Sequence, residues 1–196
     1  MATGNRKDRK IIEAAVELIA RQGYHGTSIK HITDKLGLTK PAIYAHYTGK
    51  AEIIHKIIQA FEREYLDQLI ECVTGHAGSA LDKLHRAISF VSEFATRNLD
   101  LVIAFHAINS ELKADPEFES ALARIRIKQE AFLKDLFGLG IRQGQFKKHL
   151  DPEVLSHLFL AFSRGMFQQW LESRNRLDGD LFMRNFREAF FKGLLA

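Results

Sequence analysis

Apolar residues recur every three or four positions along most of the chain, as they do in amphipathic helices. Over residues 6–22 the repeat consists of Ile11, Ala14, Ala15 and Leu18. No segment alternates apolar and polar residues with the period of two that a half-buried strand shows. The pattern therefore predicts an all-α protein in which each helix buries one side.

Glycine and proline divide this pattern into separate helices. Gly37 is expected to end a short second helix that Thr27 caps. Pro41 then fits the first turn of a third helix, because backbone N–H groups there have no acceptor within the helix. The predicted helices cover residues 6–22, 28–36, 40–47, 49–73, 79–96, 99–112, 116–136, 152–170 and 180–194.

The third predicted helix, Lys40–Tyr47, is too short to be stable alone and must be held by its neighbours. Ile43 and Tyr47 are four residues apart and can face inward, whereas Lys40 and Tyr44 share a different side. Two short helices joined by a tight glycine turn, the second with basic and hydrogen-bonding residues near its start, are typical of a helix-turn-helix motif.

The charge distribution supports a polyanion as the partner of this segment. Residues 1–56 contain ten Lys/Arg and five Asp/Glu, whereas residues 57–196 contain eighteen and nineteen. All of the excess positive charge is therefore N-terminal. All fifteen phenylalanines lie at or beyond Phe61. A basic head without phenylalanine and a nearly neutral, phenylalanine-rich body indicate two different tasks, and nucleic acid suits the head.

Signals for other classes of protein are sparse. Cys72 is the single cysteine, so no internal disulfide is expected and a reducing cytoplasm is the predicted location. No apolar run reaches the length of a membrane-spanning helix. The nine histidines lack metal-ligand pairing, and no catalytic spacing of nucleophile, base or paired carboxylates is present, so we predict no enzyme, metal site or cofactor. The glycines of GLGIRQGQ (138–145) follow no strand and are interpreted as a helix end and turn.

The segment TSIKHITDKLGLTKPAIYAHYTGKAEIIHKI (27–57) resembles the DNA-binding head of the TetR family of bacterial transcriptional repressors. The resemblance covers about residues 8–58. It rests on a helix that ends in glycine and an aromatic residue, followed by Thr-Ser, Gly-Leu-Thr, Tyr-x-His-aromatic, and a lysine that opens the fourth helix. Gly49 departs from the pattern, because a capping Ser or Asn is common there in the family.

The resemblance implies that the third helix lies in the major groove of DNA. Lys40 can reach guanine acceptors or phosphate, Ala42 can touch a thymine methyl group, and the Tyr44 hydroxyl can donate to phosphate. The full set of implied DNA contacts is Thr27, Ser28, Lys30, Thr39, Lys40, Pro41, Ala42, Tyr44, His46 and Lys50.

The resemblance also implies two domains, a helix-turn-helix head (residues 1–50) joined by a long helix to a helical ligand-binding and dimerisation body (residues 51–196). In this family the last two long helices of each subunit form a four-helix interface. Candidates for the ligand site are Phe90, Phe94, Phe105, His106, Asn109, Phe132, Phe162 and Met166. Candidates for the dimer interface are Phe159, Trp170, Phe182, Phe186 and Phe190.

The expected function is that of a cytoplasmic, ligand-responsive repressor. It would bind a palindromic DNA operator as a homodimer and be released by a small apolar or aromatic inducer, while activation in place of repression stays open. An alternative is a DNA-binding architectural or cell-division factor of the same fold without an inducer. A body with no cavity would favour this alternative.

Overall fold

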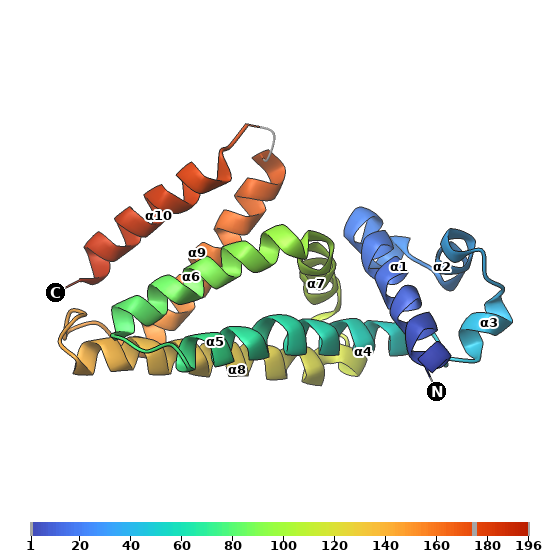
Figure 1. The fold of residues 1–196 in the computed structure, drawn as a ribbon, viewed down its shortest axis with the longest axis horizontal. Helices are drawn as coiled ribbons and strands as arrows, with labels where there is room; N and C mark the ends of the chain where they lie inside the picture. The colour runs from blue at the N-terminus through green and yellow to red at the C-terminus, as the bar shows by residue number, and fades with distance from the viewer. Residues whose placement is uncertain (1, 174–175, 196) are drawn as a thin grey trace. The chain divides into compact units, whose positions relative to one another are not determined.

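The computed structural model describes residues 2–173 and 176–195, and their side chains from Arg6 onward (Figure 1). The chain forms two compact units, Met1–Cys72 with Ala87–Ile127 and Val73–Arg86 with Lys128–Ala196. The described elements are α1 (Ala2–Gly26), α2 (Ile29–Leu36), α3 (Lys40–Tyr44), α4 (Lys50–Phe61), a π-helical segment η1 (Glu62–Asp67), α5 (Gln68–Thr74), α6 (Ala80–Arg97), α7 (Leu99–Leu112), α8 (Pro116–Arg142), α9 (Pro152–Ser173) and α10 (Gly179–Leu194). The predicted all-α fold is confirmed.

The first unit contains the head, in which α1 to α3 and the start of α4 enclose a small aliphatic core. Ile11, Ile32, Ile43 and Ile53, one from each helix, are almost fully buried. Ile43 and Tyr47 point inward, as their spacing predicted. Burial of this row of side chains holds α3, which with five residues could not persist in water on its own.

The end of α1 differs from the sequence prediction. The helix continues past Gly23, which adopts φ 74° and kinks it, and ends at Gly26. The predicted cap was wrong as well: Ser28 caps α2, and its Oγ accepts the N–H of His31 at 3.2 Å. Thr27 is buried and its hydroxyl donates to the Gly23 carbonyl at 2.9 Å, so it holds the turn before α2.

The turn between α2 and α3 follows the prediction. Gly37 adopts the left-handed conformation, with φ 64°. Its N–H bonds the Asp34 carbonyl, while the N–H of Leu38 bonds the Thr33 carbonyl at 2.9 Å. These two bonds satisfy the last carbonyls of α2 and turn the chain sharply into α3. Pro41 lies in the first turn of α3, as expected.

A helical run connects the head to the rest of the chain from Lys50 to Thr74, close to the predicted 49–73. It is not one α-helix, because the π-helical segment η1 interrupts it. Upstream, Ile57, Ile58 and Phe61 are buried with ordinary helical spacing; the next fully buried residue is Leu66, five positions after Phe61. The wider π turn accommodates this larger step.

The second unit packs the C-terminal part of α8 with α9 and α10. Asp151 caps α9, since its carboxylate accepts the N–H groups of Glu153 and Val154 at 2.8 and 3.0 Å. The GLGIRQGQ segment closes α8 and forms a turn, as predicted, with Gly144 at φ 73°. The ring of Phe146 folds back against Gly140 so closely that a Cβ there would overlap it. Glycine therefore lets Phe146 enter the core, where it is fully buried.

Candidate nucleic-acid interface and ligand pocket

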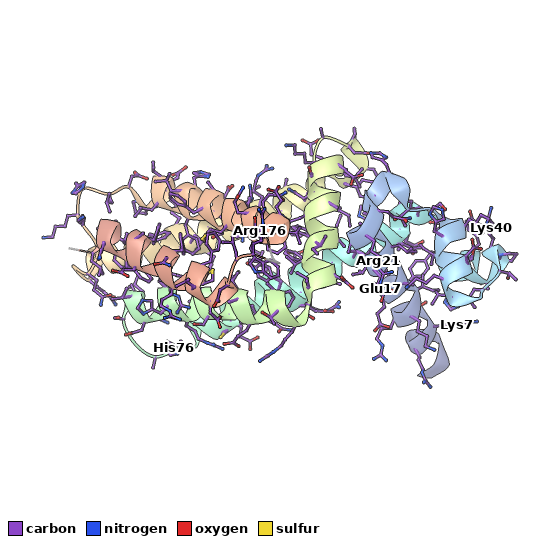
Figure 2. All side chains as sticks on the ribbon, turned by 90° about the horizontal axis from the view of Figure 1, so that it is seen from above. Lys7, Glu17, Arg21, Lys40, His76 and Arg176 are labelled. Carbon is purple, nitrogen blue, oxygen red and sulfur yellow. The ribbon has the colours of Figure 1, made fainter. Side chains whose placement is uncertain are left out.

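Four side chains form one exposed face at the start of α3. Thr39, Lys40 and Pro41 are exposed, and Tyr44 keeps 53% of its surface in contact with solvent. Lys40 lies at the outer rim of the head (Figure 2). Because Ile43 and Tyr47 anchor the opposite side of the element, this polar face is held rigidly outward and is free for a partner.

The three residues predicted to approach the DNA backbone before α2 have different environments. Thr27 is buried, with its hydroxyl bound to Gly23. Ser28 is half-buried and acts as the α2 cap. Lys30 is exposed and pairs with Asp34 at 2.6 Å along the same helix. DNA contacts from these residues stay predictions, and Lys30 is the best placed of the three.

His46 and Lys50 are also partly engaged within the head. The His46 Nδ1 lies 2.8 Å from a carboxylate oxygen of Asp8 on α1. Lys50, at the start of α4, donates to the Tyr24 carbonyl, and its Nζ lies 3.4 Å from the centre of the Tyr24 ring. Burial lowers the pKa of Lys50, although the nearby Glu111 carboxylate opposes that shift. Ala42 is half-buried beside the exposed face.

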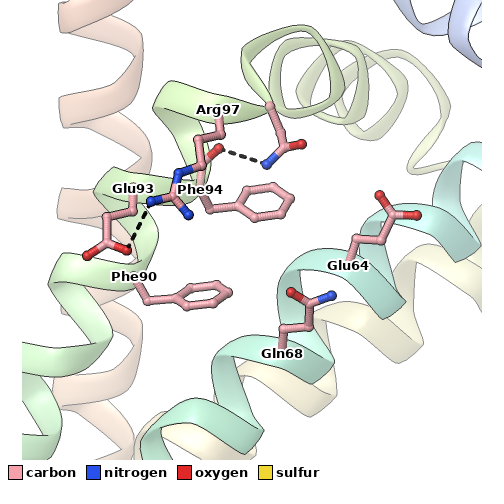
Figure 3. A pocket seen from close by; sticks show the side chains of 7 residues that line it. Glu64, Gln68, Phe90, Glu93, Phe94 and Arg97 are labelled. Atoms are coloured by element: carbon pink, nitrogen blue, oxygen red, sulfur yellow. Dashed lines mark hydrogen bonds and ion pairs between the residues drawn. The ribbon is translucent and has the colours of Figure 1, made fainter.

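A cavity of about 320 Å³ opens beside the helical run and α6. Phe90 and Phe94 of α6 lie with their rings nearly parallel, 6.1 Å apart, along one side (Figure 3). The other lining residues are polar: Glu64, Gln68, Glu93, Arg97 and Asn98. Within this lining Glu93 and Arg97 approach to 4.0 Å. The pocket thus combines a flat apolar wall with carboxylates, amides and one guanidinium group.

Residues 11–57, which form this head, match the family model described as bacterial regulatory proteins of the tetR family. The head of the chain therefore carries the DNA-binding domain that this family model describes. Most of the relatives it resembles are named as regulators of transcription, whereas one, from Shewanella halifaxensis and 23% identical over 174 residues, is named nucleoid occlusion factor SlmA. The fatty acid metabolism regulator protein of Bacillus subtilis is 24% identical over 177 residues, which are 88% of this chain and 87% of that protein.

Solved structures extend the TetR-family likeness to nearly the whole fold. The MbdR regulator from Azoarcus sp. CIB has a TM-score of 0.85 and 21% identity, with 96% of this chain and 98% of that chain covered. The regulator FadR from Bacillus subtilis, solved in complex with stearoyl-CoA, has a TM-score of 0.76 and 22% identity, with 94% and 98% covered. Both head and body therefore have the architecture of TetR-family proteins.

Of the eight ligand candidates, Phe90 and Phe94 line the cavity. Phe105 lies in the core, stacked on Phe61 with ring centres 3.6 Å apart. The remaining five, none of which lines the cavity described above, are His106, Asn109, Phe132, Phe162 and Met166. Their roles stay predictions, and the geometry favours the two phenylalanines of α6.

Three of the five dimer candidates, Phe159, Phe186 and Phe190, form an aromatic cluster between α9 and α10. Phe159 is buried, and its ring centre lies 5.5 Å from that of Phe190. Phe186 packs on Phe190 at the same separation. Trp170, Phe182, Phe186 and Phe190 are half-buried. Phe159 is therefore part of the core of its own subunit. A contact between Phe159 and a second subunit stays a prediction.

A more exposed apolar stripe lies on α9. Val154, Leu158 and Phe162 are 56%, 46% and 51% exposed. Ala161 and Gly165 are exposed between them, and positions 154, 158, 161 and 165 follow the helical period. We call these five residues the α9 stripe. The sequence pattern did not indicate this stripe, and it placed Phe162 among the candidates for the ligand site.

Glu111 is the other residue that the sequence did not indicate. It lies near the end of α7, and its carboxylate accepts the backbone N–H groups of Tyr24 and His25 at 3.1 and 3.0 Å. A single glutamate in a helix, 86 and 87 residues away along the chain, carries no sequence signal for such a contact. Its proximity to Lys50 follows only from the fold.

Among the described residues, no helix combines the length and the apolar character that crossing a bilayer requires. The described side chains also contain no cluster of three or more His, Cys, Asp or Glu residues arranged to hold a metal ion.

Proposed function

We propose that the protein is a cytoplasmic, ligand-responsive transcriptional repressor without enzymatic activity. It binds a palindromic DNA operator as a homodimer and is released by a small molecule. The observation that carries this proposal is the exposed Thr39–Tyr44 face, held outward by a buried anchor in a head that matches the TetR family.

Thr39, Lys40, Pro41, Ala42 and Tyr44 would meet the major groove. A lysine supplies a mobile cation for phosphate or guanine, and an exposed phenol donates to phosphate. Two such heads related by a two-fold axis read two half-sites about one helical turn apart, which is why the operator would be palindromic.

Selection of bound duplexes from a random pool tests this function directly. The purified protein at a stated salt concentration is expected to enrich a palindrome with two half-sites about ten base pairs apart from centre to centre, or a multiple of this. Enrichment of no sequence, with only weak and salt-sensitive binding, would contradict the repressor and favour the architectural alternative.

The pocket beside α6 is the proposed effector site. The presence of this pocket favours a ligand-responsive regulator over an architectural or cell-division factor whose body has no cavity. Phe90 and Phe94 offer a flat wall for an aromatic or apolar group, while Glu64, Arg97 and Asn98 offer hydrogen-bonding partners at the edge. Stearoyl-CoA, which is bound in the Bacillus subtilis neighbour, does not suit this pocket, because a long acyl chain needs a more apolar lining than these residues provide. A small amphipathic molecule with an aromatic body suits the site better.

Blocking the pocket should abolish the response to such a molecule. Gln68 is exposed at the rim, so Gln68→Trp is expected to fill the cavity without disturbing the core. A panel of small aromatic amphiphiles is screened by thermal unfolding. A compound at a hundred times its dissociation constant stabilises the wild type by about 2.7 kcal/mol. We expect Gln68→Trp to lose this shift and to keep operator binding.

Gln59→Trp serves as the matched control for this experiment, since Gln59 is an exposed glutamine of α4 that does not line the pocket. It should respond to the compound as the wild type does. A compound whose shift survives Gln68→Trp would bind elsewhere and would exclude this cavity as the effector site.

A homodimer is proposed on the basis of the α9 stripe. An apolar row of this kind along a long helix is stabilised when a second copy covers it. Ala161 and Gly165 carry little bulk, and a Cβ on Gly165 would meet no atom of its own chain, so a partner helix can approach closely there.

A further inference from the structure

The side chain of Lys50 is directed into the head at Tyr24. Its ammonium group donates to the Tyr24 carbonyl and lies over the Tyr24 ring, 3.4 Å from the ring centre. The residue is half-buried, and burial lowers the pKa of its ammonium group. An ammonium held by a carbonyl and an aromatic face has two favourable contacts that it would lose on turning to a phosphate.

Glu111 holds the same turn from α7. Its carboxylate accepts two consecutive backbone N–H groups, from Tyr24 and His25. Gly23 permits this approach, because a Cβ there would lie 2.7 Å from a carboxylate oxygen of Glu111 and because φ is 74°. Tyr24 is thus bound through its N–H by Glu111 and through its carbonyl by Lys50, and the two side chains attract each other.

The same helix α7 reaches the pocket at its other end. Asn98, which precedes the first turn of α7, lines the cavity, and Glu111 lies in the last turn. A helix of this length spans about 20 Å at 1.5 Å per residue. An occupant that touches Asn98 therefore acts on one end of a rigid element whose other end holds the head at Tyr24.

We propose that Lys50 and Glu111 form a clamp on the Tyr24 turn that positions the head for DNA, and that Lys50 does not contact phosphate. This assignment rests on the proposed DNA-binding function. Both are positioning residues: Glu111 joins α7 to the end of α1, and Lys50 joins the start of α4 to the same turn. Displacement of α7 by a ligand would reach the head through these contacts.

The dependence of operator affinity on salt separates a clamp from a phosphate contact. Each phosphate contact contributes about 0.9 to the slope of log K against log salt, so losing one per subunit lowers a dimer's slope by about 1.8. Lys50→Met is expected to weaken operator binding about tenfold with the slope unchanged. Lys56→Met, in an exposed lysine of α4 with the same loss of charge, should leave affinity nearly unchanged.

The partner substitution completes a double-mutant cycle. Glu111→Ala should weaken binding to a similar extent, and Glu111→Gln, which keeps one carbonyl oxygen as acceptor, should weaken it less. The double variant Lys50→Met with Glu111→Ala should bind as each single variant does, because both changes release the same turn. Independent, multiplying effects would overturn the clamp.

A readout without DNA guards against a general loss of folding. Hydrogen exchange at the Tyr24 and His25 amides is expected to accelerate at least tenfold in Glu111→Ala, while the buried amides of the head core keep wild-type rates. A slope that falls by about 1.8 in Lys50→Met, or exchange at Tyr24 and His25 that does not change in Glu111→Ala, would overturn the proposal. Failure of the wild type to bind any operator would instead contradict the proposed function.

Discussion

Replacement of Leu158 by glutamate is expected to dissociate the dimer and to abolish tight operator binding. Leu158 lies at the middle of the α9 stripe and is 46% exposed in a single subunit. In a dimer built on this stripe the carboxylate would be buried without a partner, and the two-fold axis places it there twice. We expect a loss of about 4 kcal/mol or more in association, roughly a thousandfold in the dimer dissociation constant.

Sedimentation at micromolar concentration measures this effect directly. The variant should sediment as a folded monomer with the helical content of the wild type, because residue 158 is exposed within its own subunit. Operator affinity should fall together with the dimer, since one head can occupy one half-site only.

Arg164→Gln provides the matched control on the same helix. Arg164 is exposed on α9 outside the stripe, and its replacement changes the net charge by the same amount as Leu158→Glu. It is expected to remain a dimer. A Leu158→Glu protein that is still a dimer at micromolar concentration would show that the subunits associate through another surface.

The double substitution Lys40→Ala with Tyr44→Ala should remove at least 3 kcal/mol of operator binding, roughly a hundredfold or more. Both side chains project from the exposed face, so their removal subtracts contacts to DNA in each of two half-sites. Exposed positions of this kind change the free energy of unfolding by about 0.5 kcal/mol or less. Fluorescence anisotropy with the selected duplex gives the affinity, and thermal unfolding checks the fold.

The single variant Lys40→Ala shows which part of the DNA Lys40 contacts. If Lys40 contacts phosphate, Lys40→Ala lowers the salt slope by about 1.8 in the dimer; if it contacts guanine, preference at one position of each half-site relaxes. Lys56→Ala is the control, because Lys56 is an exposed lysine outside the face. Full retention of affinity in the double variant would exclude α3 as the recognition element.

The head could be predicted from sequence because its signals are local. Isoleucines at helical spacing, the left-handed Gly37 and a proline in the first turn of α3 each specify a conformation within a few residues. The prediction placed the cap of α2 one position too early, because Thr27 and Ser28 are both residues that can cap a helix. Only the kink at Gly23 directs the Thr27 hydroxyl to a different acceptor, the Gly23 carbonyl.

The body could be predicted only as a set of helices. Phenylalanine suits a core, a pocket and an interface alike, and its role depends on which helix lies opposite. Phe105 stacks on Phe61 in the core, whereas Phe162 is 51% exposed within its subunit and lies beside Phe186 and Phe190. The environment of Lys50 in the head could not be predicted either, because the Glu111 carboxylate that lies near it is far away along the chain.

The π-helical segment η1 has a consequence for insertion and deletion in this chain. A π turn holds one residue more than the α turn that it replaces. Losing one residue from Glu62–Asp67 would place Leu66 four positions after Phe61 and leave Phe61, Leu66 and Leu69 facing inward on an unbroken α-helix. Glu64, which lines the pocket from this segment, would lose the backbone geometry that supports it. A relative one residue shorter here can keep the same core and carry a differently shaped pocket.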